Sequence, residues 1–370
     1  MYDVVVVGKG LSGLLSAIWS KEQGKKVAIV AKGTGKIIQS TGVMELYPKL
    51  SEREKTISKS KLEESINKFK SLTKSLDYPY SGHGSKTISI VTAAGYIKET
   101  NLYPETIKPI MDKGHVVIVG FEEIIDFQPK YVKGNLEKER PSLNIDTVTV
   151  SLGKNSLRTM TQLDGARLLD LKEVRDNVIE QIKDKMSEQN ISRPDLFIFP
   201  ASLGMKNWRA VINEFHKALG AEITEAPGMP PNATAIRLHE ALLKEAIKRG
   251  IRFYSDTEVI GSHMKETYLK SIVIKNNTFS RELKSFYFIN ATGGVLGGGL
   301  EVTESGFVDN AFQLEVDDYG RYRFYPQNLF TVGASRGTKV TQHGITGGLY
   351  SILSSYESIL ELGERGIKHA

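Results

Sequence analysis

Three glycines near the amino terminus have the spacing of a phosphate-binding turn. Gly8, Gly10 and Gly13 lie in GKGLSG, directly after the apolar run YDVVVV and before a segment with helical periodicity. In such a unit the first glycine permits a tight turn, the second lets backbone approach a pyrophosphate, and the third lets the helix pack close to the sheet. The N–H groups of Leu11 and Ser12 would then help to receive the phosphate. The pattern predicts a dinucleotide-binding turn; the alternative is such a turn that has lost its ligand.

The acidic residue that usually binds the ribose is missing from its expected place. It is expected about 20 residues further on, at the end of the second strand. That strand, residues 27–31, ends in Ala31 and is followed by Lys32 and Gly33, which we expect to line the site. The departure disfavours ordinary NAD binding and leaves a flavin held by other contacts, or a mononucleotide, as the ligand.

Two later strand patterns also end in small residues. The first covers residues 286–290 and the second covers residues 329–332. The small residues that follow them are Ala291, Thr292, Gly293, Gly333 and Ala334. Glycines often do no more than end a strand. Because both runs have the character of buried strands, we favour a close approach of backbone to a cofactor.

The segment from residue 336 to residue 348 carries candidate catalytic groups. His343 could transfer the proton of a substrate hydroxyl, because the pKa of histidine lies near neutrality. Arg336 could bind a phosphate with two parallel hydrogen bonds. Gly344, Gly347 and Gly348 precede a helix, and N–H dipoles there would stabilise a negatively charged ring. The alternative for both side chains is a solvent-exposed loop position.

Composition excludes several kinds of site. The chain of 370 residues has no cysteine, so disulfides, thiolate zinc sites, cysteine nucleophiles and cysteine-ligated iron–sulfur clusters are excluded. Its seven histidines form no ligand pair, and we expect no metal. The net charge of +6 is spread along the chain, so we expect no nucleic-acid partner. No uncharged stretch is apolar enough to predict a membrane span.

Taken together, three segments resemble flavoproteins with two dinucleotide-binding domains, of the fumarate reductase and D-amino-acid oxidase type. These segments are GKGLSG, the strand ending in Ala291-Thr-Gly-Gly, and Asn328–Ala334 with its following glycines and helix. Across nearly its whole length the chain further resembles the B subunit of anaerobic glycerol-3-phosphate dehydrogenase. That resemblance lies in GKGLSGLLSAIWS, Gln39–Gly42, Val119–Gln128, PASLG at Pro200–Gly204, Met229–Leu238 and Ala291–Leu300. The chain is shorter than bacterial members, and its glycines after Gly333 are spaced differently.

The resemblance implies a cofactor and further site residues. The cofactor is a flavin, FMN by the resemblance and FAD as the alternative. We expect it to be non-covalent, because the chain has no cysteine and Gln39–Gly42 has no histidine. Ser40, Thr41 and Gly42 resemble the loop that passes the flavin ring; an ordinary polar loop is the alternative. Val259 stands where related flavoproteins present backbone to adenine, and a surface strand is equally compatible.

The resemblance also implies an activity and partners. The chain would be an oxidoreductase subunit in a complex that converts sn-glycerol 3-phosphate and quinone to dihydroxyacetone phosphate and quinol. Its partners would be a catalytic flavoprotein like the A subunit of that complex and a cysteine-rich iron–sulfur protein like its C subunit. The substrate would be a small phosphorylated anion, and the location cytoplasmic or peripheral on the cytoplasmic face of the membrane through the partners. The alternatives are a stand-alone soluble flavin-dependent oxidoreductase of the fumarate reductase type and a non-redox scaffold with a relic nucleotide fold.

The expected fold class is α/β: a Rossmann-like flavin-binding domain with an inserted α/β domain. Strand patterns at residues 114–120, 144–152 and 195–200 and helical patterns at residues 162–186 and 206–219 predict the insertion. The expected division has five parts. They are a first flavin-binding part at residues 1–84, an inserted substrate or interaction domain at 85–230, a second flavin-binding part at 231–300, a small β excursion at 301–326 and a C-terminal flavin-binding part at 327–370.

Overall fold

The structure is a computed structural model that describes residues 1–45, 58–153, 159–304, 306–317, 322–336 and 347–365. The chain groups into two units. Unit 1 is Met1–Ile37, Met44–Asp77 and His239–Ala370, and unit 2 is Ile38–Val43 and Tyr78–Leu238. Each unit combines helices with a sheet that contains parallel strands, which confirms the α/β fold class. The division into five parts stays a prediction.

Unit 1 is built around a parallel sheet with β1 (Tyr2–Val7) inside it. β1 pairs in parallel with β2 (Val27–Ala31) on one side and with β14 (Ser280–Asn290) on the other. β11 (Arg252–Ser255) extends the sheet beyond β2, and β18 (Leu329–Thr331) pairs in parallel with β14. The last four residues of β1 are buried. Burial on both faces explains why this strand is a continuous apolar run and not an alternating one.

β14 belongs to two kinds of pairing at once. Its first residues pair antiparallel with β13 (Tyr268–Lys275), which pairs antiparallel with β12 (Glu258–Lys265), and its last residues pair in parallel with β1. Within the described residues the sheet therefore runs β11-β2-β1-β14-β13-β12, with β18 also on β14. A separate antiparallel sheet is formed by β15 (Leu300–Thr303), β16 (Gly306–Asp309) and β17 (Glu315–Val316).

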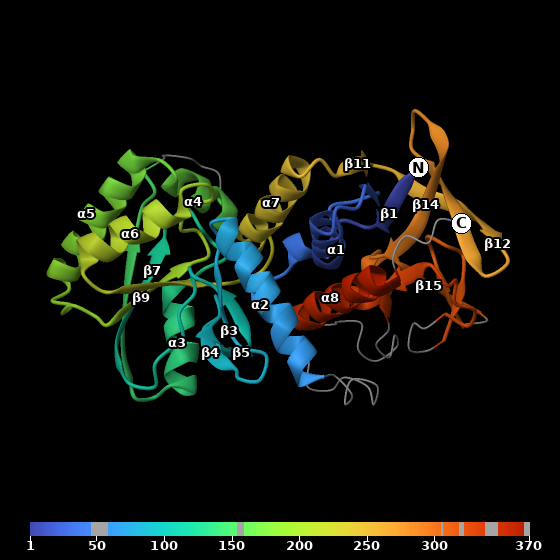
Figure 1. Ribbon diagram of the computed structural model, residues 1–370. Coiled ribbons are helices and arrows are strands. Elements are labelled where there is room, and N and C mark those ends of the chain that lie inside the picture. The colour runs from blue at the N-terminus through green and yellow to red at the C-terminus, as the bar shows by residue number, and fades with distance from the viewer. Residues whose placement is uncertain (46–57, 154–158, 305, 318–321, 337–346, 366–370) are drawn as a thin grey trace. The chain divides into compact units, whose positions relative to one another are not determined.

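Helices of unit 1 cover the parallel strands. α1 (Leu11–Glu22) packs against β1 and β2 and also against α8 (Gly348–Arg365), as Figure 1 shows for the blue and red helices. α2 (Lys59–Ser75) packs on α8 and begins at Ser58, whose hydroxyl accepts a hydrogen bond from the N–H of the third helical residue. Residues 12–20 of α1 are all buried. α7 (Ala233–Lys248) contains the last residues of unit 2 and continues into unit 1.

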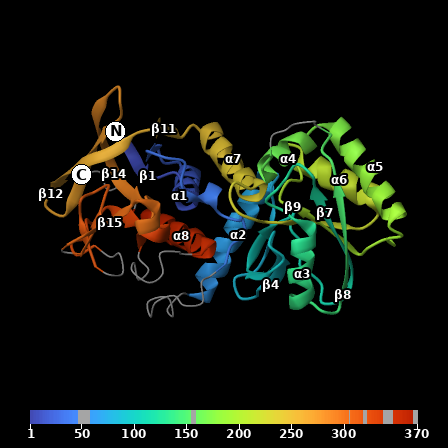
Figure 2. The same cartoon turned by 180° about the vertical axis from the view of Figure 1, so that it is seen from behind.

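Unit 2 contains a second parallel sheet, of order β10-β9-β7-β8. Its strands are β7 (Gly114–Phe121), β8 (Leu143–Val150), β9 (Leu196–Pro200) and β10 (Glu222–Ala226). Its helices are α3 (Pro129–Glu139), α4 (Gln162–Leu169), α5 (Lys172–Glu188) and α6 (Trp208–Leu219). α3 packs along β7 and β8, and α5 packs on α6 (Figure 2).

The remaining elements are short. Unit 2 also has two antiparallel strand pairs, β3 (Tyr80–Gly82) with β6 (Leu102–Pro104) and β4 (Ile88–Val91) with β5 (Ile97–Thr100). The described residues also include short 3-10 turns, η1 (Lys36–Gln39), η3 (Val295–Gly297) and η4 (Gly333–Arg336).

The helical pattern predicted over residues 162–186 forms two helices, with a short break between them. α4 ends at Leu169, and α5 begins at Lys172. Asp170, in the break, accepts hydrogen bonds on its carboxylate from the backbone N–H groups of Met205, Lys206 and Asn207, at 2.9–3.2 Å. The carboxylate at this break satisfies the N–H groups just before α6. The periodicity of residues 162–186 could not predict this, because the N–H groups lie outside that segment.

Candidate functional site

The carboxyl ends of β1, β2, β14 and β18 lie at one edge of the sheet in unit 1, because these strands run in the same direction. The predicted site residues that follow these ends are Gly8 after β1, Lys32 and Gly33 after β2, Ala291, Thr292 and Gly293 after β14, and Gly333 and Ala334 after β18. Open α/β sheets bind their ligands outside the carboxyl ends of their strands. The structure therefore brings these residues to the edge at which a ligand is expected.

Gly8 and Gly13 permit close contacts within the turn between β1 and α1. Gly8 has φ +112°, and a Cβ there would lie 2.3 Å from the carbonyl oxygen of Ala291. A Cβ on Gly13 would lie 2.1 Å from the carbonyl oxygen of Gly8. Both distances are far below van der Waals contact. The N–H of Ala291 donates to the carbonyl of Val7 at 2.8 Å, which joins the ends of β14 and β1. These two glycines thus let helix and strand ends pack closely.

Gly10 differs from its neighbours because nothing in the protein crowds it. It precedes α1 with φ −72°, and a Cβ built there would have no atom within 4 Å. As the N-cap residue it offers no side-chain acceptor to the first turn, which contains Leu11, Ser12 and Gly13. The first N–H groups of a helix lack intrahelical partners, and an anion is their favoured external acceptor. Open space beside an uncapped helix start fits the phosphate of a nucleotide cofactor.

Gly35 belongs to the same turn, although the sequence analysis did not identify it. It has φ +83°, and a Cβ there would lie 2.7 Å from the Cα of Gly10. The loop after β2 therefore packs directly on the loop after β1. The sequence around Gly35 does not predict this contact, because the contact arises only when the neighbouring strands β1 and β2 end side by side.

Asn290, the last residue of β14, is a second residue that the sequence analysis missed. Its Oδ1 accepts hydrogen bonds from the N–H of Thr292 at 3.0 Å and from the hydroxyl of Thr292 at 2.7 Å. Its Nδ2 donates to the carboxylate of Asp309 and to the hydroxyl of Tyr322. Asn290 is completely buried. Its side chain therefore fixes the backbone of the Ala-Thr-Gly-Gly turn.

The turns after β14 and β18 are held against each other and against α1. The N–H of Gly293 donates to the hydroxyl of Ser335 at 2.8 Å. The N–H of Gly333 donates to the hydroxyl of Ser354 at 2.8 Å, and the hydroxyl of Ser355 donates to the carbonyl of Ser12 at 3.1 Å. A Cβ on Gly333 would lie 2.2 Å from the Oγ of Ser12. Serines of α8 and α1 therefore set the position of the strand ends around the first turn of α1.

Lys32 is engaged with a residue from another strand. Its Nζ lies 2.5 Å from an oxygen of Glu258, at the start of β12, and both side chains are exposed. The hydrogen bond from Lys32 lowers the pKa of Glu258 below its usual value. Val259, the position predicted to face adenine, is the next residue and is buried.

The carboxyl-terminal candidates fall into two groups. His343 and Gly344 lie outside the described residues. Arg336 is described, and its Nη1 lies 2.6 Å from an oxygen of Glu357 on α8, with both side chains about one-quarter to one-third exposed. Gly347 and Gly348 lie at the start of α8. The N–H of Tyr350 donates to the carbonyl of Gly347 at 3.1 Å. An ion pair competes with the predicted binding of a phosphate by Arg336.

Ser40, Thr41 and Gly42 belong to unit 2, where side chains hold their backbone. The carbonyl of Ser40 accepts from the amide of Asn232 at 3.1 Å, and that of Thr41 accepts from the hydroxyl of Thr234 at 2.7 Å. The carbonyl of Gly42 accepts from the hydroxyl of the buried Tyr80, at 2.7 Å. Three successive carbonyls are thus fixed, so this loop is ordered by unit 2 itself.

Arg237 forms a buried ion pair in unit 2. Its Nη1 and Nη2 donate to the two carboxylate oxygens of Glu225 at 2.7 and 2.9 Å, and its Nε donates to the carbonyl of Gly204 at 2.7 Å. The side chains of Arg237 and Glu225 are 2% and 0% exposed. Both side chains are satisfied by protein partners, so we interpret the pair as structural. The neighbouring hydroxyl of Tyr78 is also buried, and burial raises its pKa to about 12.

His239 is a buried titratable group of unit 1. Its side chain is 7% exposed, and its Nε2 has no hydrogen-bond partner among the described residues. Burial lowers the pKa of His239 below its usual value, and the charge of Lys9 acts in the same direction. A hydrogen bond to the backbone of Thr34 opposes both effects. The imidazole is therefore stabilised in its neutral form.

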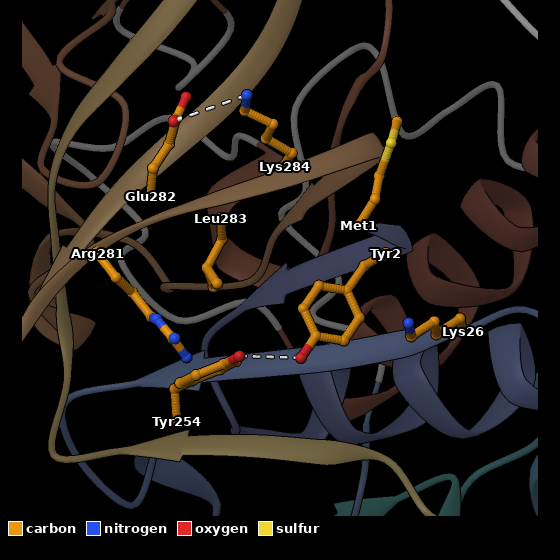
Figure 3. A pocket seen from close by; sticks show the side chains of 8 residues that line it. All are labelled: Met1, Tyr2, Lys26, Tyr254, Arg281, Glu282, Leu283 and Lys284. Carbon is orange, nitrogen blue, oxygen red and sulfur yellow. Dashed lines mark hydrogen bonds and ion pairs between the residues drawn. The ribbon is translucent and has the colours of Figure 1, made fainter.

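A pocket of about 340 Å³ lies at the other edge of the parallel sheet (Figure 3). It is lined by residues at the start of β1, before β2, on β11 and on β14, and Figure 3 shows Tyr2, Tyr254 and Arg281 facing one another. The hydroxyls of the two tyrosines are 2.9 Å apart. This pocket contains none of the predicted site residues, and its lining belongs to the amino end of β1. It is therefore separate from the glycine-lined edge.

Two kinds of feature are absent from the residue ranges that the structure describes. In those ranges, no group of three or more histidine, aspartate or glutamate side chains is placed to hold a metal ion. No helix in those ranges has the length and apolar character needed to cross a membrane.

The parallel sheet, the glycine turn and the uncapped helix start define a protein with a Rossmann-type nucleotide-binding fold. Residues 3–56 match the family model of an FAD binding domain. The chain is 25% identical over 334 residues to the B subunit of anaerobic glycerol-3-phosphate dehydrogenase from Mannheimia succiniciproducens, covering 81% of this chain and 75% of the relative. It is 22% identical to the protein of the same name from Aliivibrio fischeri, covering 99% of this chain and 92% of the relative.

Among solved structures, the chain is similar to Thermovibrio ammonificans THI4, with 10% sequence identity and a TM-score of 0.39, covering 98% of this chain and 90% of that one. The family match and the named relatives confirm the resemblance to the B-subunit family. They also confirm that the chain is a flavoprotein and an oxidoreductase with a non-covalent flavin, without deciding between FMN and FAD. The individual site residues stay predictions.

Proposed function

We propose that the chain is the flavin-bearing B subunit of a glycerol-3-phosphate dehydrogenase complex. The complex would convert sn-glycerol 3-phosphate and quinone to dihydroxyacetone phosphate and quinol. One observation carries the proposal: the uncapped start of α1 at Gly10 lies within the segment that matches an FAD binding domain. Relatives that bear the name of this B subunit match most of the chain and support the specific complex.

The residues of unit 1 would bind and orient the cofactor. The N–H groups after Gly10 would donate to its phosphate, and the turns at Gly293 and Gly333 would approach it with backbone. Gly347 and Gly348 would direct the N–H groups of α8 towards negative charge on the ring. A bound flavin supplies acceptance of two electrons and their release one at a time. Arg336 and His343 stay candidates for binding the substrate phosphate and for moving its hydroxyl proton.

The composition of the chain supports the need for partners. Transfer of electrons to a quinone in the membrane usually runs through iron–sulfur clusters, which cysteine thiolates hold. This chain has no cysteine. In the proposed complex a cysteine-rich partner like the C subunit supplies the clusters and the membrane attachment at the cytoplasmic face, and a flavoprotein like the A subunit oxidises the substrate.

The test compares the purified chain alone with the chain co-expressed with both kinds of partner. We expect the chain alone to bind flavin, to release all yellow colour on denaturation, and to give no glycerol-3-phosphate:quinone turnover above background. The assembled complex should turn over. Equal turnover by the single chain would replace the subunit role with a stand-alone enzyme. A colourless chain that cannot be reconstituted with either flavin would leave the scaffold as the function.

A further inference from the structure

A carboxylate stands at the place where the sequence lacks one. Lys32 directly follows β2, and its Nζ lies 2.5 Å from Oε2 of Glu258. The N–H of Thr257 donates to the carbonyl of Ala31 at 3.2 Å, so the residue before β12 is tied to the last residue of β2. Glu258 is 226 residues from Lys32 in sequence. Glu258 therefore places a carboxylate beside the end of β2, although the sequence has no acid at that position.

The carboxylate of Glu258 has capacity for a ligand. Its side chain is 45% exposed. Lys32 and Lys275, which stands opposite it in the register of β12 and β13, both lower its pKa, so the group is ionised near neutrality. An ionised carboxylate offers about four acceptor positions, and the recorded hydrogen bond from Lys32 uses one of them.

The end of β2, where this carboxylate stands, is adjacent to the turn after β1 that is proposed to bind the phosphate. β1 and β2 are neighbouring parallel strands, so their ends are about 5 Å apart. The loop after β2 contacts the loop after β1, since a Cβ on Gly35 would lie 2.7 Å from the Cα of Gly10. In a dinucleotide the ribose lies beside the pyrophosphate and is bound by an acid at the end of the second strand.

We propose that Glu258 accepts hydrogen bonds from the ribose hydroxyls of the adenosine half of FAD, and that Lys32 positions its carboxylate. The inference rests on the proposed flavin site and deepens it by naming FAD, not FMN, as the flavin. FMN has no adenosine half, so it gains nothing from Glu258. The absence of an acid after Ala31 therefore does not favour FMN.

The test is titration of the full-length apoprotein with FAD, with FMN, and with an FAD analogue that lacks the 2′-hydroxyl of the adenosine ribose. We expect Glu258→Gln to weaken FAD about tenfold, the low end for a hydrogen bond to a charged group, because the carboxylate is partly solvated. FMN affinity should stay within twofold. Wild type should lose affinity for the deoxy analogue, and Glu258→Gln should not distinguish the analogue from FAD.

Two further variants separate a specific role from a general one. Glu266→Gln removes another exposed carboxylate, from the turn after β12, and should change neither affinity. Lys32→Ala should weaken FAD alone, and Lys32→Arg should restore it. Unchanged FAD binding in Glu258→Gln, or equal loss of FAD and FMN, would overturn the inference while leaving the flavin site intact. Failure of wild type to bind either flavin would overturn the proposed function and the inference together.

Discussion

Replacing Gly10 with alanine should separate binding of the flavin from folding of the protein. A Cβ at this position would meet no protein atom within 4 Å, and φ is −72°, which every residue adopts. At Gly13, in contrast, a Cβ would lie 2.1 Å from the carbonyl oxygen of Gly8. The space beside Gly10 is therefore free of protein atoms, and a methyl group there should obstruct only the proposed ligand.

The expected magnitudes follow from these contacts. Alanine is a poorer N-cap than glycine by up to about 1 kcal/mol. It also lowers the entropy of the unfolded chain, which stabilises by about 0.4–1 kcal/mol. The free energy of unfolding of Gly10→Ala should thus stay within about 1 kcal/mol of wild type. Each hydrogen bond to the phosphate that the methyl group displaces should cost about 1.5–3 kcal/mol, or about 10- to 150-fold in affinity. Gly10→Val should abolish binding.

The assay pairs urea unfolding of the apoprotein with titration by flavin. Gly134→Ala in α3 is the matched control, because its Cβ would also meet no atom within 4 Å and it lies outside the proposed site. It should keep full flavin affinity. Gly13→Ala should instead lower the stability of unit 1. Flavin affinity of Gly10→Ala within twofold of wild type would refute the phosphate-binding role of this turn.

Two other predictions concern buried ionisable side chains. Arg237→Met leaves the carboxylate of Glu225 buried without its partner and should lower the free energy of unfolding by about 3–5 kcal/mol. In urea unfolding, the double variant with Glu225→Leu should recover much of this lost stability. A loss of stability below about 1 kcal/mol in Arg237→Met would contradict the structural role of the pair. For His239 the folded pKa lies below the unfolded one. The unfolded state therefore takes up the proton first as pH falls below about 6.5, and stability should drop between pH 7.5 and 5.5. His239→Asn should lose less stability over that interval, and an identical loss would show that the histidine does not contribute.

Local sequence patterns predicted the elements that carry their own signal. β1 is a continuous apolar run, the glycines after it mark the turn to α1, and the buried pattern of β14 leads into its glycine turn. These features depend on residues within a few positions of one another. For the same reason the α/β class could be inferred from local patterns, whereas the flavin was inferred from the resemblance to a known family.

The parts that sequence did not predict depend on contacts between distant residues. The carboxylate of Glu258 completes the end of β2 from another strand, and Asn290 fixes Thr292 while binding the buried Asp309. Gly35 is placed against Gly10 by two strands that end side by side. No periodicity or spacing reports such pairs, because each arises only when the sheet has formed.

The pairing of β1 with β14 sets an order for the making of this protein on the ribosome. Tyr2 pairs with Ser285, which is 283 residues away, so β1 keeps one unpaired apolar edge while most of the chain is synthesised. At about 5–20 residues per second that wait lasts about 15 to 60 seconds. The strands of the sheet in unit 2 lie within residues 114–226 and emerge earlier. The nascent chain therefore exposes an unpaired strand edge that favours aggregation and that a chaperone would protect. The carboxyl ends of β1, β2, β14 and β18, where we propose that the cofactor binds, come together only after most of the chain has emerged.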